Sequence, residues 1–416
     1  MNKYIIKNPS QLITCSGIHG KRGKEMMDLN ILENSSLVIE GEYIKDVGKT
    51  ENIFEKYNYN NEYTVIDASG KVVMPGFIDS HTHFVFGGYR EKEFNMRVQG
   101  KDYMEIMRSG GGIISTVKET REESYDELLQ KARKRLDHML SLGITTVEGK
   151  SGYGLDFQTE IKQLEIMKEL NDTHPIDIIS TYLGAHSIPD EYKDNPDEYI
   201  NYIIEEVLPY IKKYKLAEFC DVFCEKNVFS VNQSRKLLEK AKQMGFNLKI
   251  HADEMVSLGG SELAVELGAT SADHLLNISE EGIKKITKSD TVATLLPGTA
   301  FSLREKYANA REIINNNAIV AIASDFNPGS CFTEYVPFII LLSTLYMGMK
   351  IEEAITAYTI NAAAALNREN KTGSLDIGKL ADLIIIDYPS YEFIQYHMCY
   401  NPVEVVFKRG RMVYKK

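Results

Sequence analysis

In residues 72–83, VVMPGFIDSHTH, an apolar strand runs directly into a polar segment that ends in two histidines. Seven further apolar runs follow, and segments with helical periodicity separate them. This alternation predicts βα units and a parallel sheet. The expected strands are 72–78, 144–148, 176–183, 219–223, 247–251, 271–274, 292–296 and 318–323. Eight such strands predict an α/β fold of the (β/α)8 barrel type, and a doubly wound open sheet is the alternative.

The polar residues at the strand ends favour the barrel, because the active site of such a fold lies at the carboxyl ends of its strands. The first strand leads into His81 and His83, and the fifth ends in His251. The sixth ends in His274, and Asp325 follows the eighth. We therefore expect these side chains to converge.

The HxH pair suggests a metal site. One residue, Thr82, separates His81 from His83, so on an extended segment both imidazoles point to the same side. An isolated pair could be two unrelated surface histidines, but His251 and Asp325 stand at the same end of their own strands. Imidazole nitrogens and a carboxylate suit zinc or iron. Such an ion would lower the pKa of bound water and polarise a carbonyl, which predicts hydrolysis.

Both ends of the chain are strand-like and rich in turns. Short β-branched runs at 36–39 and 43–47 are separated by glycines. Near the carboxyl end, runs at 403–407 and 411–414 are joined by Arg409-Gly410, which suits a hairpin. We expect one small sheet domain, built from residues 1–70 plus 368–416, beside a barrel domain at 71–367. A length of 416 residues accommodates two domains at about 150 residues each, the barrel being the larger.

Composition narrows the partners and the compartment. Acidic residues outnumber basic ones by 59 to 48, which gives a formal charge of −11. The sequence has no long block of Lys and Arg that would indicate binding to nucleic acid. Five cysteines, an odd number, fit a reducing compartment better than a disulfide framework. The first thirty residues hold no apolar run of signal-peptide length, and the longest apolar stretch falls short of the roughly 18 residues of a membrane span. We expect a cytoplasmic enzyme with no nucleic-acid or membrane partner.

Several segments carry a resemblance to a known family. PGFIDSHTH, KIHAD, SADH and ASDFNPGS, in that order at predicted strand ends, resemble the amidohydrolase superfamily. More narrowly, the sequence resembles the imidazolone hydrolases of histidine degradation in the segments HFVFGGYREKEFNMRVQGKDYMEIMRSGGGI, KSGYGL, YLGAHSIP, CDVFCEK, KIHADE and ATLLPGTAFSL. The match spans residues 75–330 and continues into GSLDIGKLADLIIID at 373–387.

The resemblance implies a fold and a ligand set. Members of the superfamily pair a metal-bearing (β/α)8 barrel with a small β-sandwich built from both termini. The implied ligands are His81, His83, His251 and Asp325, holding one divalent or trivalent ion per subunit, zinc or iron. Many members bind a second metal through a group after the fourth strand, but the narrower family resembles a mononuclear one, so Lys226 is not assigned as a ligand. Paired subunits are common for this architecture, and we expect a homodimer.

Three acid–base residues are expected beside the metal. Asp325 could move the proton of the attacking water as well as bind the metal, and His274 would hydrogen-bond that water or the developing oxyanion. His274 could instead be a core hydrogen-bond donor. Glu254, three residues beyond His251, would meet the ring nitrogens during ring opening. Which of the three acts as general base stays open.

The substrate implied by the resemblance is a five-membered imidazolone with a propionate tail, hydrolysed at its ring amide to N-formimidoyl-glutamate. The residues expected to bind it are Arg90, Tyr153, His186, Glu254, Asn327, Gly329 and Ser330. Arg90 suits a bidentate grip on the tail carboxylate, although it could be an exposed structural residue. Tyr153, flanked by two glycines, could be a packed turn residue instead.

Two other functions stay open at this level. One is a different enzyme of the same superfamily, such as a nucleobase deaminase. The other is a non-catalytic relative that uses the barrel as an assembly scaffold. The presence of all four expected ligands argues against the scaffold.

Overall fold

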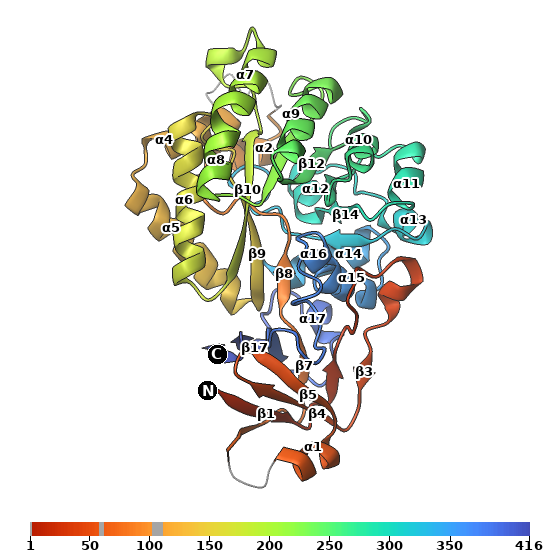
Figure 1. Ribbon diagram of the computed structural model, residues 1–416. Coiled ribbons are helices and arrows are strands. Elements are labelled where there is room, and N and C mark those ends of the chain that lie inside the picture. The colour runs from red at the N-terminus through yellow and green to blue at the C-terminus, as the bar shows by residue number, and fades with distance from the viewer. Residues whose placement is uncertain (1, 58–61, 102–110) are drawn as a thin grey trace.

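The computed structural model describes residues 2–57, 62–101 and 111–416, and it confirms the predicted barrel (Figure 1). Residues 102–110, which belong to the long motif at 83–113, lie outside the described part. Eight strands form one sheet in the order β15-β14-β13-β12-β11-β10-β9-β8, and every neighbouring pair is parallel. The strands are β8 (Phe77–Asp79), β9 (Ile144–Lys150), β10 (Asp177–Ala185), β11 (Phe219–Cys224), β12 (Asn247–Ala252), β13 (Ser271–His274), β14 (Val292–Leu295) and β15 (Val320–Ile322).

The barrel closes where the segments after β8 and β15 meet. A parallel bridge joins Thr82 to Phe326. The backbone N–H of His83 donates to the carbonyl of Phe326 at 2.9 Å, and the N–H of Asp325 donates to the carbonyl of His81 at 3.0 Å. Closure of the barrel therefore places His81 and His83, which follow its first strand, beside Asp325, which follows its last strand.

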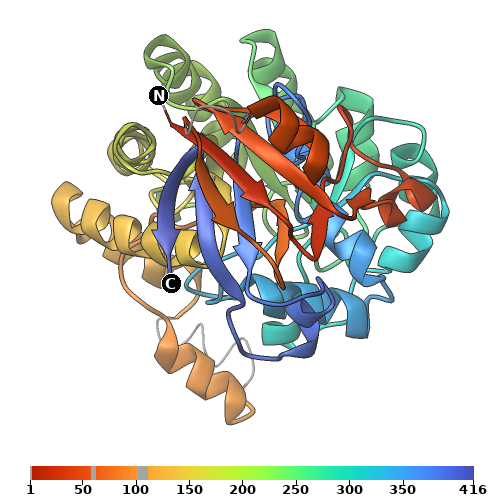
Figure 2. The same cartoon turned by 90° about the horizontal axis from the view of Figure 1, so that it is seen from below.

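Helices surround the barrel (Figures 1 and 2). They are α2 (Glu91–Val98), α4 (Ile113–Glu122), α5 (Tyr125–Ser141), α6 (Phe157–Thr173), α7 (Pro196–Tyr202), α8 (Leu208–Tyr214), α9 (Val231–Gln243), α10 (Gly260–Leu267), α11 (Glu280–Ile286), α12 (Pro297–Leu303), α13 (Ala310–Asn315), α14 (Val336–Tyr346), α15 (Ile351–Ala357) and α16 (Ile360–Ala364). Helix α5 begins at a capping box in which the Ser124 side chain accepts from the N–H of Glu127, and its apolar face packs on the barrel. Short helical turns lie at η1 (Gly23–Met27), η2 (Asp190–Tyr192) and η3 (Ile203–Val207). Over the described ranges, none of the helices has the length and apolar character needed to cross a bilayer.

Both termini build the small domain, as predicted (Figure 2). One sheet has the order β5 (Tyr43–Lys49), β4 (Ser35–Glu40), β1 (Lys3–Lys7) and β6 (Thr64–Asp67). The other has the order β18 (Arg411–Lys415), β17 (Val403–Lys408), β16 (Leu383–Ile386), β7 (Val72–Pro75), β2 (Gln11–Ile13) and β3 (Ile31–Leu32). Apolar side chains of both sheets, among them Leu37 and Phe407, share one core. Helices α1 (Thr50–Tyr57) and α17 (Phe393–Tyr396) complete the termini.

The predicted hairpin near the carboxyl end is confirmed. β17 and β18 pair antiparallel. Arg409 and Gly410 between them both have positive φ, at 46° and 66°. Two successive left-handed residues are the geometry of a type I′ turn, whose twist matches that of the flanking strands.

The first predicted strand, 72–78, is wrong as a single barrel strand. It divides at Gly76 into β7, which belongs to the six-stranded sheet, and β8, which belongs to the barrel. The N–H of Gly76 donates to Asp382, whereas the N–H of Phe77 donates to Gly143, so the hydrogen-bond partner changes domain at this point. A Cβ at residue 76 would lie 2.3 Å from the Thr145 side chain, which explains the glycine.

Ion pairs link the small domain to the barrel. The buried Lys408 Nζ lies 2.9 Å from Asp177 Oδ2, at the start of β10, and 2.7 Å from Asp382 Oδ2. Arg409 Nη2 also contacts Asp177, at 3.0 Å. Burial alone would raise the pKa of Asp177, but the two cations outweigh it and hold that pKa below its usual value.

Candidate metal centre and substrate site

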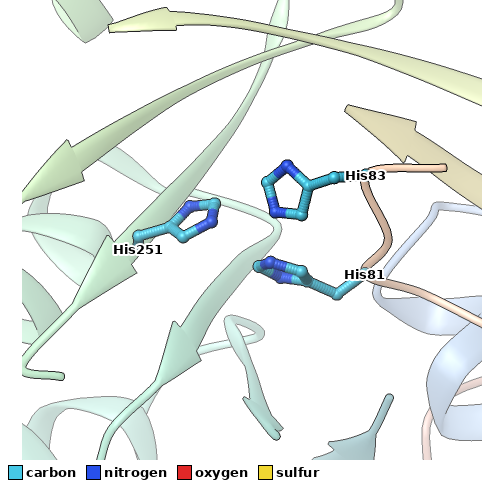
Figure 3. Close-up of side chains that lie close together, drawn as sticks. All are labelled: His81, His83 and His251. Atoms are coloured by element: carbon cyan, nitrogen blue, oxygen red, sulfur yellow. The ribbon is translucent and has the colours of Figure 1, made fainter. Parts of the chain in front are cut away.

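Three histidines meet at the carboxyl end of the barrel (Figure 3). His81 and His83 come from the segment after β8, and His251 comes from β12. All three are buried, and one ring nitrogen of each lies within 4.8 Å of those of the other two. The fold thus brings the HxH pair together with His251, which is far from it in the sequence.

Asp325 lies beside two of these three histidines. Its Oδ1 lies 3.5 Å from Nε2 of His81 and 3.5 Å from Nε2 of His83. Ligand atoms of a tetrahedral site with bonds of about 2.1 Å stand about 3.4 Å apart, so this spacing suits one ion. The other carboxylate oxygen accepts a hydrogen bond from Thr299 Oγ1 at 2.5 Å. Asp325 has a left-handed backbone, with φ at 53°, a conformation that L-residues adopt mainly where the surroundings impose it.

The donor atoms of this group fit a metal ion. Nε2 of His81 and Nε2 of His251 are buried and have no hydrogen-bond partner among the described residues. Burial lowers the pKa of His81 and His83, and it lowers that of His251 to about 3, which keeps the rings neutral. Neutral imidazole is the form that binds metals. Lys226, which was not assigned as a ligand, has an exposed side chain.

Two further carboxylates hold the histidine rings, and the sequence reasoning did not identify them. Asp273 Oδ2 lies 2.6 Å from His81 Nδ1, and Asp221 Oδ2 lies 2.9 Å from His251 Nδ1. The Asp273 contact is a hydrogen bond, whereas the Asp221 contact is close but does not have hydrogen-bond geometry. Outer carboxylates in such positions commonly orient the imidazoles of a metal site. The sequence did contain one signal for these two residues: each is a charged residue within a strand that otherwise has the pattern of a buried strand.

His274 and Glu254 lie beside the histidine cluster. The ring centroid of His274 is 5.1 Å from that of His251 and 5.5 Å from that of His81. Its Nδ1 is 3.6 Å from Glu254 Oε2. Burial raises the pKa of Glu254. The expected acid–base residues are therefore together at one edge of the metal group.

Tyr153 and His186 lie on the opposite flank. The His186 ring stacks on His83, with centroids 5.0 Å apart and planes at 12°, and the Tyr153 ring is 5.4 Å from His186. His186 Nδ1 is 3.1 Å from the carbonyl of Gly152, which leaves Nε2 for another partner. Burial lowers the pKa of His186 to about 3. The buried Glu160 accepts three backbone N–H groups of the Tyr153 loop at 2.8–3.1 Å and so fixes its shape.

Arg90 is held by a neighbouring acid. Its Nε and Nη2 donate to Glu93 Oε2 at 3.0 Å and 2.8 Å. The Nε–Nη2 edge is therefore engaged, and the Nη1–Nη2 end remains for a ligand. A Cβ at Gly329 would lie 2.0 Å from Arg90 Nη1, so the guanidinium packs directly against the glycine backbone.

The loop at residues 327–330 is braced from within. Asn327 Oδ1 accepts the N–H groups of Gly329 and Ser330, both at 2.8 Å. Its Nδ2 donates to the carbonyl of Asp325 at 2.7 Å and to Ser330 Oγ at 2.9 Å. The amide of Asn327 and the N–H of Gly329, expected to face the substrate, are thus engaged inside the loop. The loop follows Asp325 and lies against Arg90.

The fold and the site define a class. Buried imidazoles and an aspartate at the carboxyl ends of parallel barrel strands are the arrangement of a metal-dependent hydrolase, and the sequence pattern of the amidohydrolase family matches residues 72–413. An imidazolonepropionase of Clostridium tetani is 57% identical over 412 residues, covering 99% of this chain and 98% of the relative. One of Parabacteroides distasonis is 51% identical and covers 99% of each chain. The chain belongs to the amidohydrolase family and, within it, to the imidazolonepropionases.

Solved structures agree on the fold. A triazine hydrolase from Arthobacter aurescens superimposes with a TM-score of 0.74 at 16% identity, covering 100% of this chain and 95% of the other. An adenosine deaminase from Xanthomonas campestris with bound zinc gives a TM-score of 0.70 at 14% identity, covering 99% and 92%. At such identities the likeness concerns the fold alone.

Proposed function

We propose that this protein hydrolyses the cyclic amide bond of 4-imidazolone-5-propanoate to give N-formimidoyl-L-glutamate in histidine degradation, with water as the nucleophile. The observation that carries the proposal is the identity of 57% with an imidazolonepropionase over nearly the whole of both chains. The buried histidine and aspartate group supports it, because amide hydrolysis at neutral pH needs an activated water.

The proposed ligands are His81, His83, His251 and Asp325. A metal ion held by them would lower the pKa of water and polarise the ring carbonyl. Elemental analysis of the protein as purified should give one ion per subunit, zinc or iron, since three imidazoles and one carboxylate accept either.

The acid–base steps fall to three residues of the chain. Asp325 receives the proton of the attacking water, and His274 donates a hydrogen bond to the oxyanion that develops on the former carbonyl. Glu254 delivers a proton to the ring nitrogen that leaves. Its raised pKa suits this role, because a carboxyl group that retains its proton nearer to neutral pH can act as an acid.

The remaining residues bind and orient the substrate. The open end of the Arg90 guanidinium binds the tail carboxylate, and Tyr153 and His186 contact the ring beside His83. Ser330 offers its hydroxyl from the loop after Asp325. The same loop, shaped by Asn327 and Gly329, holds Arg90 in place.

The proposal extends to assembly and location. We expect a cytoplasmic homodimer whose partner is a small molecule and neither nucleic acid nor membrane. The expected division is into residues 1–70 plus 368–416 and residues 71–367. Because β7 pairs in the six-stranded sheet, we place the first crossing into the barrel at Gly76 and not at residue 71. Light scattering of the purified protein checks the oligomeric state.

The activity is tested with purified, metal-loaded protein on two substrate classes. We expect turnover of 4-imidazolone-5-propanoate and no release of ammonia from adenine, guanine or cytosine. Ammonia release without imidazolone turnover would instead identify a deaminase. Turnover of neither substrate would favour the alternative that the protein is a non-catalytic scaffold.

A further inference from the structure

A cluster of fully buried charges lies beneath the histidine ligands. It contains two lysines and three acids: Glu148, Lys150, Asp221, Lys249 and Asp273. They come from β9 and, on the other side of β10, from the three consecutive strands β11, β12 and β13. Buried charges are costly unless they are paired, so this cluster calls for a specific explanation.

Lys150 is the centre of the cluster. Its Nζ lies 2.7 Å from Asp221 Oδ2, 3.0 Å from Glu148 Oε1 and 3.5 Å from Asp273 Oδ2. Burial by itself would lower the pKa of Lys150, but these three carboxylates raise it, which keeps the side chain charged.

Lys150 contacts the same carboxylate oxygens that contact the ligand histidines. Asp273 Oδ2 is shared between Lys150 and His81 Nδ1, and Asp221 Oδ2 is shared between Lys150 and His251 Nδ1. One ammonium group therefore lies against both carboxylates that contact Nδ1 of His81 and of His251. Such outer contacts commonly change metal affinity by about 10- to 100-fold.

The cluster also accounts for a second group of possible ligands. Donor atoms of His81, Glu148 and Asp273 lie close enough together to hold a cation. Both oxygens of Glu148 are already engaged, one by Lys150 at 3.0 Å and the other by Lys249 at 2.9 Å. Fixed ammonium groups thus provide the positive charge that a second metal ion would bring.

We propose that Lys150 is a positioning residue for the metal centre: it fixes the carboxylates of Asp221 and Asp273, which orient His251 and His81, and it replaces a second cation. The inference rests on the proposed metal site. It predicts that loss of the Lys150 charge weakens metal binding even where the fold survives.

The test compares Lys150→Met with Lys249→Met. Both variants remove a buried ammonium group that contacts Glu148, but in the described contacts Lys249 touches neither Asp221 nor Asp273. Affinity for Zn²⁺ is measured by chelator competition, and the visible spectrum of the Co²⁺-loaded protein reports ligand geometry. We expect a loss of affinity of about 10- to 100-fold and an altered Co²⁺ spectrum for Lys150→Met. For Lys249→Met we expect a change of only a few-fold.

Thermal unfolding separates positioning from general destabilisation, because both variants should lose stability. Lys150→Gln, which keeps a polar end without charge, serves if Lys150→Met does not fold, and it should show the same loss of affinity. Wild-type affinity in both Lys150 variants, or an equal loss in Lys249→Met, would overturn the inference. Failure of the unmodified protein to bind metal would instead refute the proposed metal site.

Discussion

Arg90→Ala should raise KM for the imidazolone substrate while leaving kcat and bound metal nearly unchanged. The Glu93 carboxylate engages the Nε–Nη2 edge of the guanidinium, and the Nη1–Nη2 end is left for the propionate tail. The tail lies away from the reacting amide, so it is held equally in the ground state and the transition state. Loss of such uniform binding appears in KM.

The size of the expected loss in kcat/KM follows from the strength of a hydrogen bond to a charged group. A hydrogen bond to a charged group is worth about 1.5–3 kcal/mol, and about 1.4 kcal/mol corresponds to a factor of ten, so kcat/KM should fall roughly 10- to 150-fold. Removing Arg90 also leaves the Glu93 carboxylate, which is 12% exposed, facing the anionic tail. The single variant should therefore lie near the upper end of this range, and Arg90→Ala combined with Glu93→Gln should recover part of the loss.

The decisive assay uses a substrate analogue whose tail carboxylate is converted to the amide. Steady-state kinetics are measured for the wild type and for Arg90→Ala on both compounds. The four values of kcat/KM form a double-perturbation cycle that isolates the interaction between Arg90 and the tail carboxylate. The variant should lose much with the carboxylate and little with the amide. An equal loss with both compounds, or loss of metal on elemental analysis, would refute the assignment and make Arg90 a structural residue.

Three further outcomes are expected. Gly329→Ala places a Cβ 2.0 Å from Arg90 Nη1 and must displace the guanidinium, so KM should rise several-fold with kcat retained in steady-state kinetics. His274→Ala should lower kcat by about 10²- to 10³-fold, as loss of an oxyanion donor does, with metal content unchanged by elemental analysis. Asp177→Asn removes one of the two carboxylates that contact Lys408 and should cost about 2 kcal/mol in denaturant unfolding at pH 7. Because the folded pKa of Asp177 is depressed, its contribution is present above the unfolded value of about 4 and is lost as pH falls through the folded pKa, so the variant and the parent should converge in acid.

The convergence of the expected ligand side chains could be predicted because it follows a rule of topology. In a parallel barrel the ends of all strands meet at one rim, so His81, His83, His251 and Asp325 had to approach one another once the eight strands were identified. The division of strand 72–78 could not be predicted in this way. Its residues read as one apolar run, and only the change of hydrogen-bond partner at Gly76 separates the two sheets.

The buried charge cluster could not be predicted from the sequence pattern either, but for a different reason. Glu148 and Lys150 are two residues apart on β9, so alternation does place them on one face of the strand. The distant partners of Lys150, Asp221 and Asp273, are 71 and more residues away along the chain, and the pairing depends on how the strands are ordered and in which register they pair. A charged pair in an otherwise buried strand therefore indicates that a network of buried charges exists, but it does not identify the other residues of that network.

The acidic balance of the chain bears on how an anionic substrate is bound. At physiological ionic strength charges are screened over about 8 Å, so surface carboxylates contribute little to the potential at the tail site. Among the described residues, the charges nearest to the proposed tail site are those of Arg90, which pairs with Glu93, and of Arg97, whose Nη2 donates to the carbonyl of Gly329 at 2.9 Å. The formal charge of −11 therefore opposes long-range attraction of the substrate but not its binding, which depends on the guanidinium groups within contact distance. Removal of a distant surface carboxylate should leave KM unaltered, whereas the loss of Arg90 cannot be compensated by the rest of the surface.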